Sequence, residues 1–326
     1  MEKHQKPLFT LELVGNHNIL FQSRVKMTSL CHSAAGANAG FNYQFERAFY
    51  WLAQSPAGAA IGIETSDDVA VRDVDGTLIL EQDKHSIRDG AEPFGDRSKD
   101  LWNTLMIWIN AVESKQVEIE TTTFLLVTNK VLSDCIAKSI GNAKTSADAA
   151  KCIAALKSAA KNPPQTIASI VARVLDVNSQ PILNALIVRV ELADGTTASA
   201  GPELRQATIG HLQLPGWCDT HSQSIADELL GWLHKITLKL WREKQPAWIL
   251  RDHFVNQMHA ILDRRKRQSQ RERAEYLIPI TPEKVGEERG RPFVKQLHLV
   301  SEDEAIVDTS IQDFIRCNIE KIRLSK

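Results

Sequence analysis

Residues 59–84 read AAIGIETSDDVAVRDVDGTLILEQDK, and this stretch decides the fold. It contains three short apolar runs, AAIGIE, VAVRDV and TLILEQ, of the kind that form strands. Asp75 and Gly76 separate the second run from the third, and an Asp-Gly pair in that position is a strong signal for a β-hairpin. The stretch therefore predicts one strand followed by a hairpin.

Helical segments and a further strand flank this hairpin along the chain. FNYQFERAFYWLAQS, residues 41–55, and KDLWNTLMIWINAV, residues 99–112, place apolar side chains at helical spacing. TTTFLLVTNKV, residues 121–131, is a β-branched run typical of a strand that is covered on both faces. This alternation predicts an α/β fold, in which helices flank a sheet.

The second half of the chain has mainly helical patterns. Two Ala-rich helical stretches between 143 and 176 are separated by an Asn-Pro-Pro triplet, and long amphipathic helices are predicted for 224–243 and 247–268. Residues 184–195 have the composition of a strand that leads into a turn. The Pro- and Gly-containing stretch 279–292 is the best linker candidate.

A chain of 326 residues is longer than one hydrophobic core usually grows, so two domains are expected. We predict an N-terminal extension (1–35), an α/β domain (36–165) and a mainly α-helical C-terminal domain (166–326). Met27 is compatible with an extension added before it, whereas LFTLELVG is equally compatible with a strand. The role of the first residues therefore remains open in the sequence.

Composition limits the classes of function. The formal net charge of -1 gives no overall attraction to nucleic acid or to an anionic membrane, so such binding requires a local patch. The cysteines contain no C-x-x-C pair, which argues against a zinc site and a disulfide framework and favours a reducing cytoplasm. No apolar run approaches eighteen residues, so we expect no membrane-spanning segment.

Polar side chains gather at the open ends of the predicted hairpin. The turn before its first strand contains Asp67 and Asp68, and its second strand ends with Gln82 and Lys84, which share one strand face. A two-residue loop places Asp67 opposite Lys84, whereas a three-residue loop with a bulged glycine places Asp68 opposite Gln82. We favour Asp68 and keep Asp67 as the alternative. Either register brings together an acid, an amide and a lysine, which suits a hard cation and a phosphate.

Three more residues lie near these groups. Gln44 is on the inner side of the first predicted helix, and Glu64 opens the turn that leads to the aspartates. A helix-capping or core-edge amide is an equally good interpretation of Gln44, and a solvent contact at a strand end is the main rival for Glu64. His85 points to the strand face opposite Lys84, which favours a structural role.

These residues carry a resemblance to a known superfamily. Asp68, the Gln82-Asp83-Lys84 triplet and the helical GFNYQFERA resemble PD-(D/E)xK restriction-endonuclease-like proteins, in the form where glutamine replaces the acid. More narrowly, residues 36–130 resemble the double-stranded DNA endonuclease domain of bacterial anti-phage effectors such as those of CBASS systems, through GFNYQFERAFYWLA, IGIETSDDVAV, LILEQDKHS and DRSKDLWNTLMIWINAV. The resemblance implies a mixed sheet flanked by helices and phosphodiester hydrolysis that depends on Mg²⁺ or Mn²⁺.

The resemblance also implies residue roles. It assigns catalytic positions to Asp68, Gln82, Lys84, Glu64 and Gln44. Among these, Asp68 and Gln82 are expected to bind the metal, with Asp67 as a further metal candidate, and Lys84 to contact the phosphate or the attacking water. Since glutamine replaces an acid, the site has one negative charge fewer, which weakens cation binding unless Glu64 or Asp67 compensates.

The C-terminal segment RPFVKQLHLVSEDEAIVDTSIQDFIRCNIEKIRLSK, residues 291–326, resembles the last module of ABC-three-component defence proteins. A nuclease domain joined to this module is the architecture of the nuclease subunit of Lamassu, or DdmABC, systems, which act against phages and plasmids. The resemblance implies an SMC-like ATPase and a small accessory subunit as partners, and this sequence has no G-x-x-x-x-G-K-[ST] phosphate loop. Because such nucleases have one active site per chain, cutting both strands implies a homodimer or larger homo-oligomer.

A basic run, DRRKRQSQRER at 263–273, is the other candidate contact for nucleic acid. Together with Lys84, its candidate residues are Arg264, Arg265, Lys266 and Arg267. A solvated helix end and an acidic protein partner are the rival interpretations. Two alternative functions remain open, a catalytically inactive DNA-binding or assembly subunit and an RNA-cutting effector.

Overall fold

The structure is a computed structural model that describes residues 34–277 and 279–324. The predicted N-terminal extension, 1–35, lies outside the described residues except for Ala34 and Ala35, the latter of which begins the first helix.

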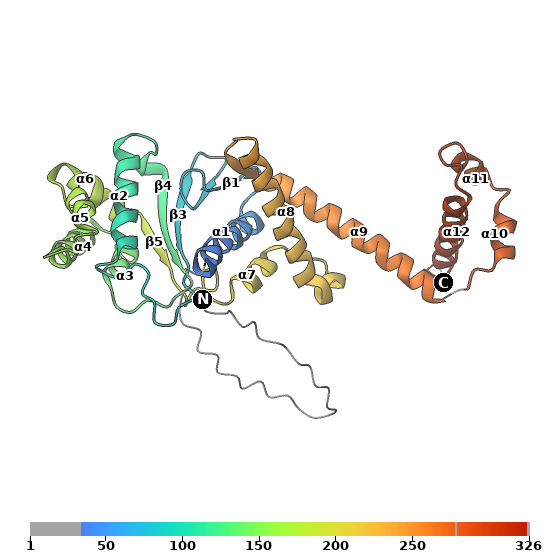
Figure 1. Ribbon diagram of the computed structural model, residues 1–326, viewed down its shortest axis with the longest axis horizontal. Helices are drawn as coiled ribbons and strands as arrows, with labels where there is room; N and C mark the ends of the chain where they lie inside the picture. Colours follow the sequence, from blue (N-terminus) through green and yellow to red (C-terminus); the bar gives the residue numbers. More distant parts are fainter. Residues whose placement is uncertain (1–33, 278, 325–326) are drawn as a thin grey trace, which may run out of the picture. The chain divides into compact units, whose positions relative to one another are not determined.

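A six-stranded mixed sheet forms the centre of the α/β region (Figure 1), with the strand order β5-β4-β3-β2-β1-β6. Strands β1, β2 and β3 form an antiparallel meander, and β6 adds to β1 in the antiparallel sense. Strands β4 and β5 run parallel to β3. The strands are β1 (Ala60–Ile63), β2 (Val69–Arg72), β3 (Leu78–Lys84), β4 (Thr122–Thr128), β5 (Val190–Ala193) and β6 (Ala247–Leu250). The predicted α/β class with a mixed sheet is confirmed.

Helices cover both faces of this sheet (Figure 1). One face is covered by α2 (Lys99–Glu113), α3 (Ile136–Gly141), α4 (Ser146–Ala159), α5 (Ala168–Val174) and α6 (Gln180–Ile187). The other face is covered by α1 (Ala35–Gln54), α7 (Leu204–His211), α8 (Ser222–Arg242) and the first turns of α9 (Arg251–Leu277).

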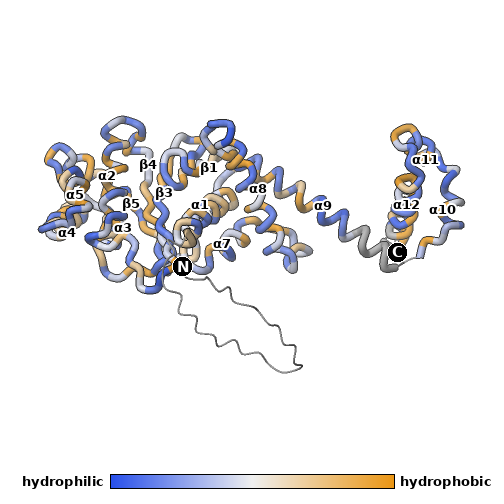
Figure 2. The backbone as a smooth tube through the Cα atoms, viewed as in Figure 1, coloured by the Kyte–Doolittle hydropathy of each residue, from blue (hydrophilic) through white to orange (hydrophobic). Residues whose placement is uncertain are grey.

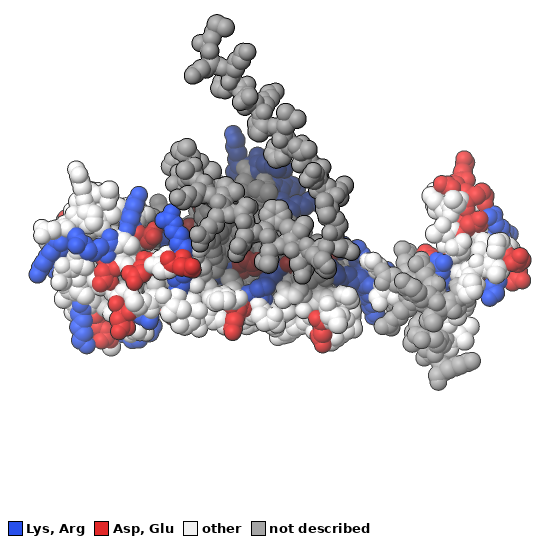
Figure 3. Space-filling model, turned by 60° about the horizontal axis from the view of Figure 1, so that its bottom comes forward, with Lys and Arg blue, Asp and Glu red and all other residues white. Residues whose placement is uncertain are grey.

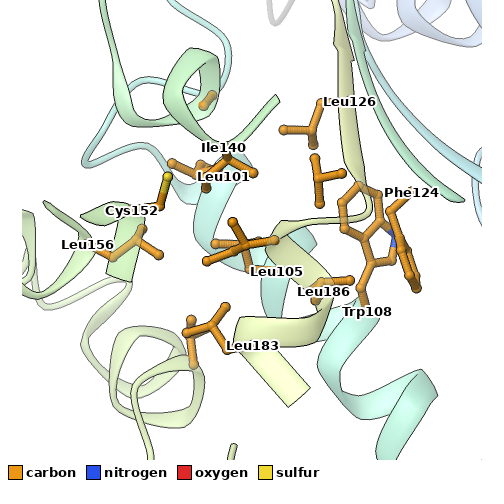
Figure 4. Close-up of a cluster of buried hydrophobic side chains, with 14 of the residues drawn as sticks. Leu101, Leu105, Trp108, Phe124, Leu126, Ile140, Cys152, Leu156, Leu183 and Leu186 are labelled. Atoms are coloured by element: carbon orange, nitrogen blue, oxygen red, sulfur yellow. The ribbon is translucent and has the colours of Figure 1, made fainter. Parts of the chain in front are cut away.

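Strand alternation divides the apolar side chains between two cores. Leu80 and Phe124 point toward α2, while Val69 and Val71 point toward α1. Figure 4 shows the α2 side, where Trp108 lies against Phe124 with ring centroids 5.1 Å apart. Burying a side chain of this size contributes roughly 1.5–3 kcal/mol, so each core stabilises the sheet from its own side.

The domain boundary predicted at residue 165 does not coincide with a break in this core. Leu156 before the boundary and Val171 after it belong to the same buried cluster. Strands β5 and β6, which form the two edges of the sheet, both come from the second half of the chain. The sheet is completed by long-range pairing, which local sequence patterns do not reveal.

Two local predictions in the second half were wrong in part. Residues 247–250 were assigned to a helix but form β6, which pairs with β1 so that Trp248 lies opposite Gly62. A short apolar run fits a helix and a strand equally well, and here an available sheet edge decided. Within 184–195, only Val190–Ala193 is strand, because the preceding residues complete α6.

The C-terminal helices share a cluster of their own. α10 (Pro282–Glu288), α11 (Pro292–Leu297) and α12 (Glu304–Leu324) bury Val285, Val294, Val307, Ile311 and Ile315 together. The stretch 279–292 was predicted as a linker but contains α10, so that prediction was wrong, while the helical character of the region is confirmed. Figure 2 shows that α9 becomes hydrophilic beyond its first turns. None of the helices in the described part of the chain combines the length and apolar character that crossing a bilayer requires.

Candidate functional site

The hairpin register decides between the two aspartates. Val69 pairs with Glu81 and Arg72 with Leu78, and the same register places Asp68 opposite Gln82. The loop is the longer of the two alternatives, and the backbone N–H of Asp73 donates to the carbonyl of Thr77 at 3.0 Å. Of the two predicted registers, the structure therefore has the one with the three-residue loop, which places Asp68 opposite Gln82.

Asp68, Gln82 and Lys84 converge at the open end of the hairpin. Asp68 Oδ2 accepts hydrogen bonds from Gln82 Nε2 and, at 2.8 Å, from the backbone N–H of Asp83. Lys84 Nζ lies 3.9 Å from the same oxygen. The side chains of Lys84 and Asp68 are 28% and 17% exposed, so solvent reaches this corner.

The amide of Gln82 also touches α2, because its Oε1 accepts from Thr104 Oγ1 at 3.2 Å. A 180° turn of the amide would place its oxygen beside Asp68 and its NH₂ beside Thr104. A hydroxyl group both donates and accepts, so Thr104 satisfies either orientation. Gln82 can therefore present an oxygen to a cation at Asp68 and keep its partner on α2.

Asp67 has structural partners for both of its oxygens. Trp108 Nε1 donates to Oδ2 at 2.6 Å, and the backbone N–H of Asp68 donates to Oδ1 at 3.0 Å. Burial raises the pKa of Asp67 to about 7, and the hydrogen bond from Trp108 opposes that rise. These contacts fix the turn before β2 and leave Asp67 no oxygen without a donor.

Gln44 and Glu64 have different surroundings. Gln44, on α1, lines a cavity of about 320 Å³, and its Oε1 has no hydrogen-bond partner among the described residues. The cavity is lined by Ala37, Gly40, Phe41, Gln44, Asp68, Asp83, Lys84 and His85. Glu64 is exposed and does not line it, although its backbone N–H donates to the carbonyl of Asp68 at 3.0 Å. The structure therefore brings Gln44 to the site through its side chain and Glu64 only through its backbone.

Asp83 is the residue that sequence reasoning missed. Its side chain lines the cavity, the residue is only 6% exposed, and neither carboxylate oxygen has a hydrogen-bond partner among the described residues. Burial, followed by the negative charge of Glu81, raises the pKa of Asp83 well above its ordinary value, and Arg47 opposes that rise. The sequence did indicate burial of this residue, because strand alternation places Glu81 and Asp83 on the same face of the strand as the apolar Ile79.

Glu81 anchors this end of β3 to α1. Its carboxylate accepts from Arg47 Nε at 2.6 Å and Nη2 at 2.7 Å, and from Trp51 Nε1 at 2.6 Å. Arg47 Nη1 donates to the carbonyl of Ser199. The strand that carries Gln82 and Lys84 is thus tied to the helix that carries Gln44.

The oxygen donors around the cavity suit a hard cation. The described residues contain no group of three or more His, Cys, Asp or Glu that could hold a metal ion. Two carboxylates, Asp68 and Asp83, and two amides, Gln44 and Gln82, are nevertheless present at this corner. Mg²⁺ binds such oxygens and keeps several waters, whereas zinc prefers nitrogen and sulfur ligands, so the set fits Mg²⁺ or Mn²⁺.

The basic residues of α9 differ in their availability. Arg264 and Arg265 both form ion pairs with Glu228 of α8, and Arg265 Nη1 also donates to Ser224 Oγ at 2.9 Å. Lys266 and Arg267 are exposed. Since Arg264 and Arg265 are already paired, Lys266 and Arg267 are the better candidates for a phosphate contact on α9.

Over α4–α6, on the face that Figure 3 shows, basic and acidic side chains are interspersed.

Comparisons with protein-family models, with curated proteins and with solved structures found no match to this chain.

Proposed function

We propose that this protein is an endonuclease that hydrolyses phosphodiester bonds of double-stranded DNA with the help of Mg²⁺ or Mn²⁺. The convergence of Asp68, Gln82 and Lys84 at one solvent-accessible corner of a β-hairpin is the observation that supports this function. An acid, an amide oxygen and an ammonium group side by side suit a cation and a phosphate at the same place.

Each of the three side chains has a distinct role in the proposal. Asp68 and Gln82 would hold the cation, which supplies an activated water and stabilises negative charge on the phosphate. Lys84 is partly exposed and carries its ammonium group 3.9 Å from Asp68, so it can reach a phosphate oxygen beside the cation. Its positive charge is already in position before charge develops in the transition state, which is the condition for effective electrostatic catalysis.

The surrounding residues give this site its rigidity. Asp67 holds the preceding turn against Trp108, and the Arg47–Glu81 pair holds β3 against α1. Both contacts act through side chains that are not themselves placed at the phosphate. They restrict the movement of the acid and the lysine, as precise positioning requires.

The biological setting that we propose follows the resemblance to the nuclease subunit of Lamassu-type defence complexes. In that setting the enzyme acts on phage or plasmid DNA in the cytoplasm as a homo-oligomer and is restrained by an SMC-like ATPase and a small accessory subunit. The C-terminal helices α10–α12 are the proposed contact for these partners. Co-purification of the protein with the products of its neighbouring genes tests the partners directly.

Plasmid cleavage tests the activity. Purified protein is incubated with supercoiled plasmid and Mg²⁺, beside Lys84→Ala and the exposed-surface control Lys144→Ala. We expect nicking by the wild type and the control, and a loss on the order of 10²–10³-fold in Lys84→Ala, because a preorganised charge is removed. Equal nicking by all three proteins, or none by the wild type, would contradict the proposal. Cleavage of RNA alone would redirect it to the RNA-cutting alternative.

A further inference from the structure

Two acids on the same face of β3 have opposite surroundings. Glu81 is fully buried and accepts hydrogen bonds from Arg47 and Trp51. Asp83, two residues further along the strand, is buried almost as deeply and receives no hydrogen bond from a donor among the described residues. Its carboxyl group lies close to that of Glu81, and two acids can hydrogen-bond to each other only when they share a proton. A buried carboxylate without a partner is strongly destabilising, so a group outside the protein chain is expected to satisfy it.

The polar neighbours of Asp83 direct their donors elsewhere. Arg47 points Nε and Nη2 at Glu81 and Nη1 at the carbonyl of Ser199. The hydroxyl of Tyr43 donates to the carbonyl of Ala200 at 2.7 Å. The fold thus supplies several donors near Asp83 and aims them away from its carboxylate.

A third unsatisfied oxygen belongs to Gln44, which lines the same cavity. Gln44 is 9% exposed, and its Oε1 has no hydrogen-bond partner among the described residues. Gln44, Asp83 and Asp68 all line the cavity of about 320 Å³ at the end of β3. That volume holds a cation together with several water molecules, since one water occupies about 30 Å³ in the liquid.

We propose that Asp83 and Gln44, together with Asp68, bind a hard divalent cation in this cavity, with Asp83 as the second carboxylate. The three unsatisfied oxygens, two on Asp83 and one on Gln44, are all acceptors, so a cation satisfies them and an anion does not. Asp83 then restores the negative charge that glutamine at position 82 removes. Glu64 and Asp67 do not take this part, because Glu64 does not line the cavity and both oxygens of Asp67 already accept hydrogen bonds.

Direct binding of Mn²⁺ to the full-length protein tests the site without any DNA. The free Mn²⁺ signal in electron paramagnetic resonance is titrated with protein, and Mg²⁺ is then added as a competitor. The variants are Asp83→Asn, which keeps the shape but not the charge, and Gln44→Met, which keeps the length but not the amide oxygen. The matched control is Asp89→Asn, which removes one charge from an exposed position outside the cavity.

We expect Mn²⁺ affinity to fall at least tenfold in Asp83→Asn, several-fold in Gln44→Met and not at all in Asp89→Asn. Asparagine imitates a protonated aspartic acid. If the Mn²⁺ affinity of Asp83→Asn is within twofold of the wild-type value, a proton rather than a cation satisfies Asp83, and the inference is overturned. If Asp83→Asn does not fold, Gln44→Met provides the test. An Mn²⁺ affinity of Gln44→Met equal to that of the wild type would then rule out the proposed cation site.

The cation's part in catalysis rests on the proposed nuclease function, but its binding does not. Mn²⁺ binding that depends on Asp83, combined with no DNA cleavage by the wild type, would retain the cation site and remove the nuclease. DNA cleavage combined with Mn²⁺ binding that is unchanged in the Asp83 and Gln44 variants would retain the nuclease and remove this cation site.

Discussion

Arg47 and Glu81 form a two-pronged ion pair between α1 and β3, with guanidinium nitrogens 2.6 Å and 2.7 Å from the two carboxylate oxygens. Both side chains are almost completely buried. This pair joins the helix that carries Gln44 to the strand that carries Gln82 and Lys84.

Removing one partner of this pair should destabilise the fold strongly. In Arg47→Met the carboxylate of Glu81 stays buried without its counter-charge, and we expect a loss of about 3–5 kcal/mol in the free energy of unfolding. The double variant Arg47→Met/Glu81→Met should recover part of that loss, because no isolated charge remains. Urea unfolding measures both. Arg88→Met, at an exposed position after β3, is the control and should cost less than about 1 kcal/mol.

Asp67 and Asp68 are adjacent, yet we expect opposite effects on activity when they are changed. Asp68→Asn removes the acid at the centre of the site and should abolish detectable plasmid nicking. Asp67→Asn keeps one acceptor for Trp108 and should retain nicking within about tenfold, with a loss of about 1 kcal/mol in stability for the hydrogen bond that is no longer made. Loss of nicking in Asp67→Asn in a correctly folded protein would return Asp67 to the set of metal candidates.

The hairpin and its polar ends were predictable because the signals are local. An Asp-Gly loop and strand alternation are enough to place one of the two aspartates beside Gln82 and Lys84, whereas the loop length, which selects Asp68, is seen only in the structure. The role of Asp83 was harder to predict, because its isolation depends on donors in α1 and on carbonyl groups more than a hundred residues away. The edge strand β6 was missed for the same reason, since its pairing with β1 joins distant parts of the sequence.

Gly201 lies in the loop whose backbone carbonyls accept hydrogen bonds from Tyr43 and Arg47 of α1, and this loop requires a glycine here. A Cβ at this position would lie 2.4 Å from the backbone oxygen of Gly195, so the loop has to move. We expect Gly201→Ala to lower the free energy of unfolding by about 1–3 kcal/mol. Gly231→Ala is the control, because this glycine is exposed in α8 with open space around it and alanine there should add about 0.5–1 kcal/mol. Thermal denaturation of both variants checks the contrast, and equal effects would refute it.

The exposed basic pair on α9 should contribute to DNA affinity through phosphate contacts. In Lys266→Gln/Arg267→Gln we expect weaker binding to any duplex and a salt slope reduced by about 2, one for each lost contact. Fluorescence anisotropy on a labelled duplex, without divalent cation, measures the slope at several salt concentrations. Arg264→Gln should instead weaken the packing of α9 on α8, because Arg264 already pairs with Glu228. An unchanged slope in the double variant would assign this run to another partner.

His234 should make stability depend on pH. Its ring stacks on Phe45 with centroids 3.7 Å apart, and burial lowers the pKa of His234 in the folded protein. The unfolded chain, with a histidine pKa of about 6.5, therefore binds a proton more readily than the folded protein. The contribution of His234 to stability is complete above the pKa of the unfolded state and declines as the pH falls through that value toward the lower pKa of the folded state.

Urea unfolding at pH 7.5 and pH 5.5 measures this effect. Between these two pH values we expect the wild type to lose more stability than His234→Phe, while the exposed-site variant His259→Gln behaves like the wild type. Equal losses in wild type and His234→Phe would show that this ring does not titrate with folding.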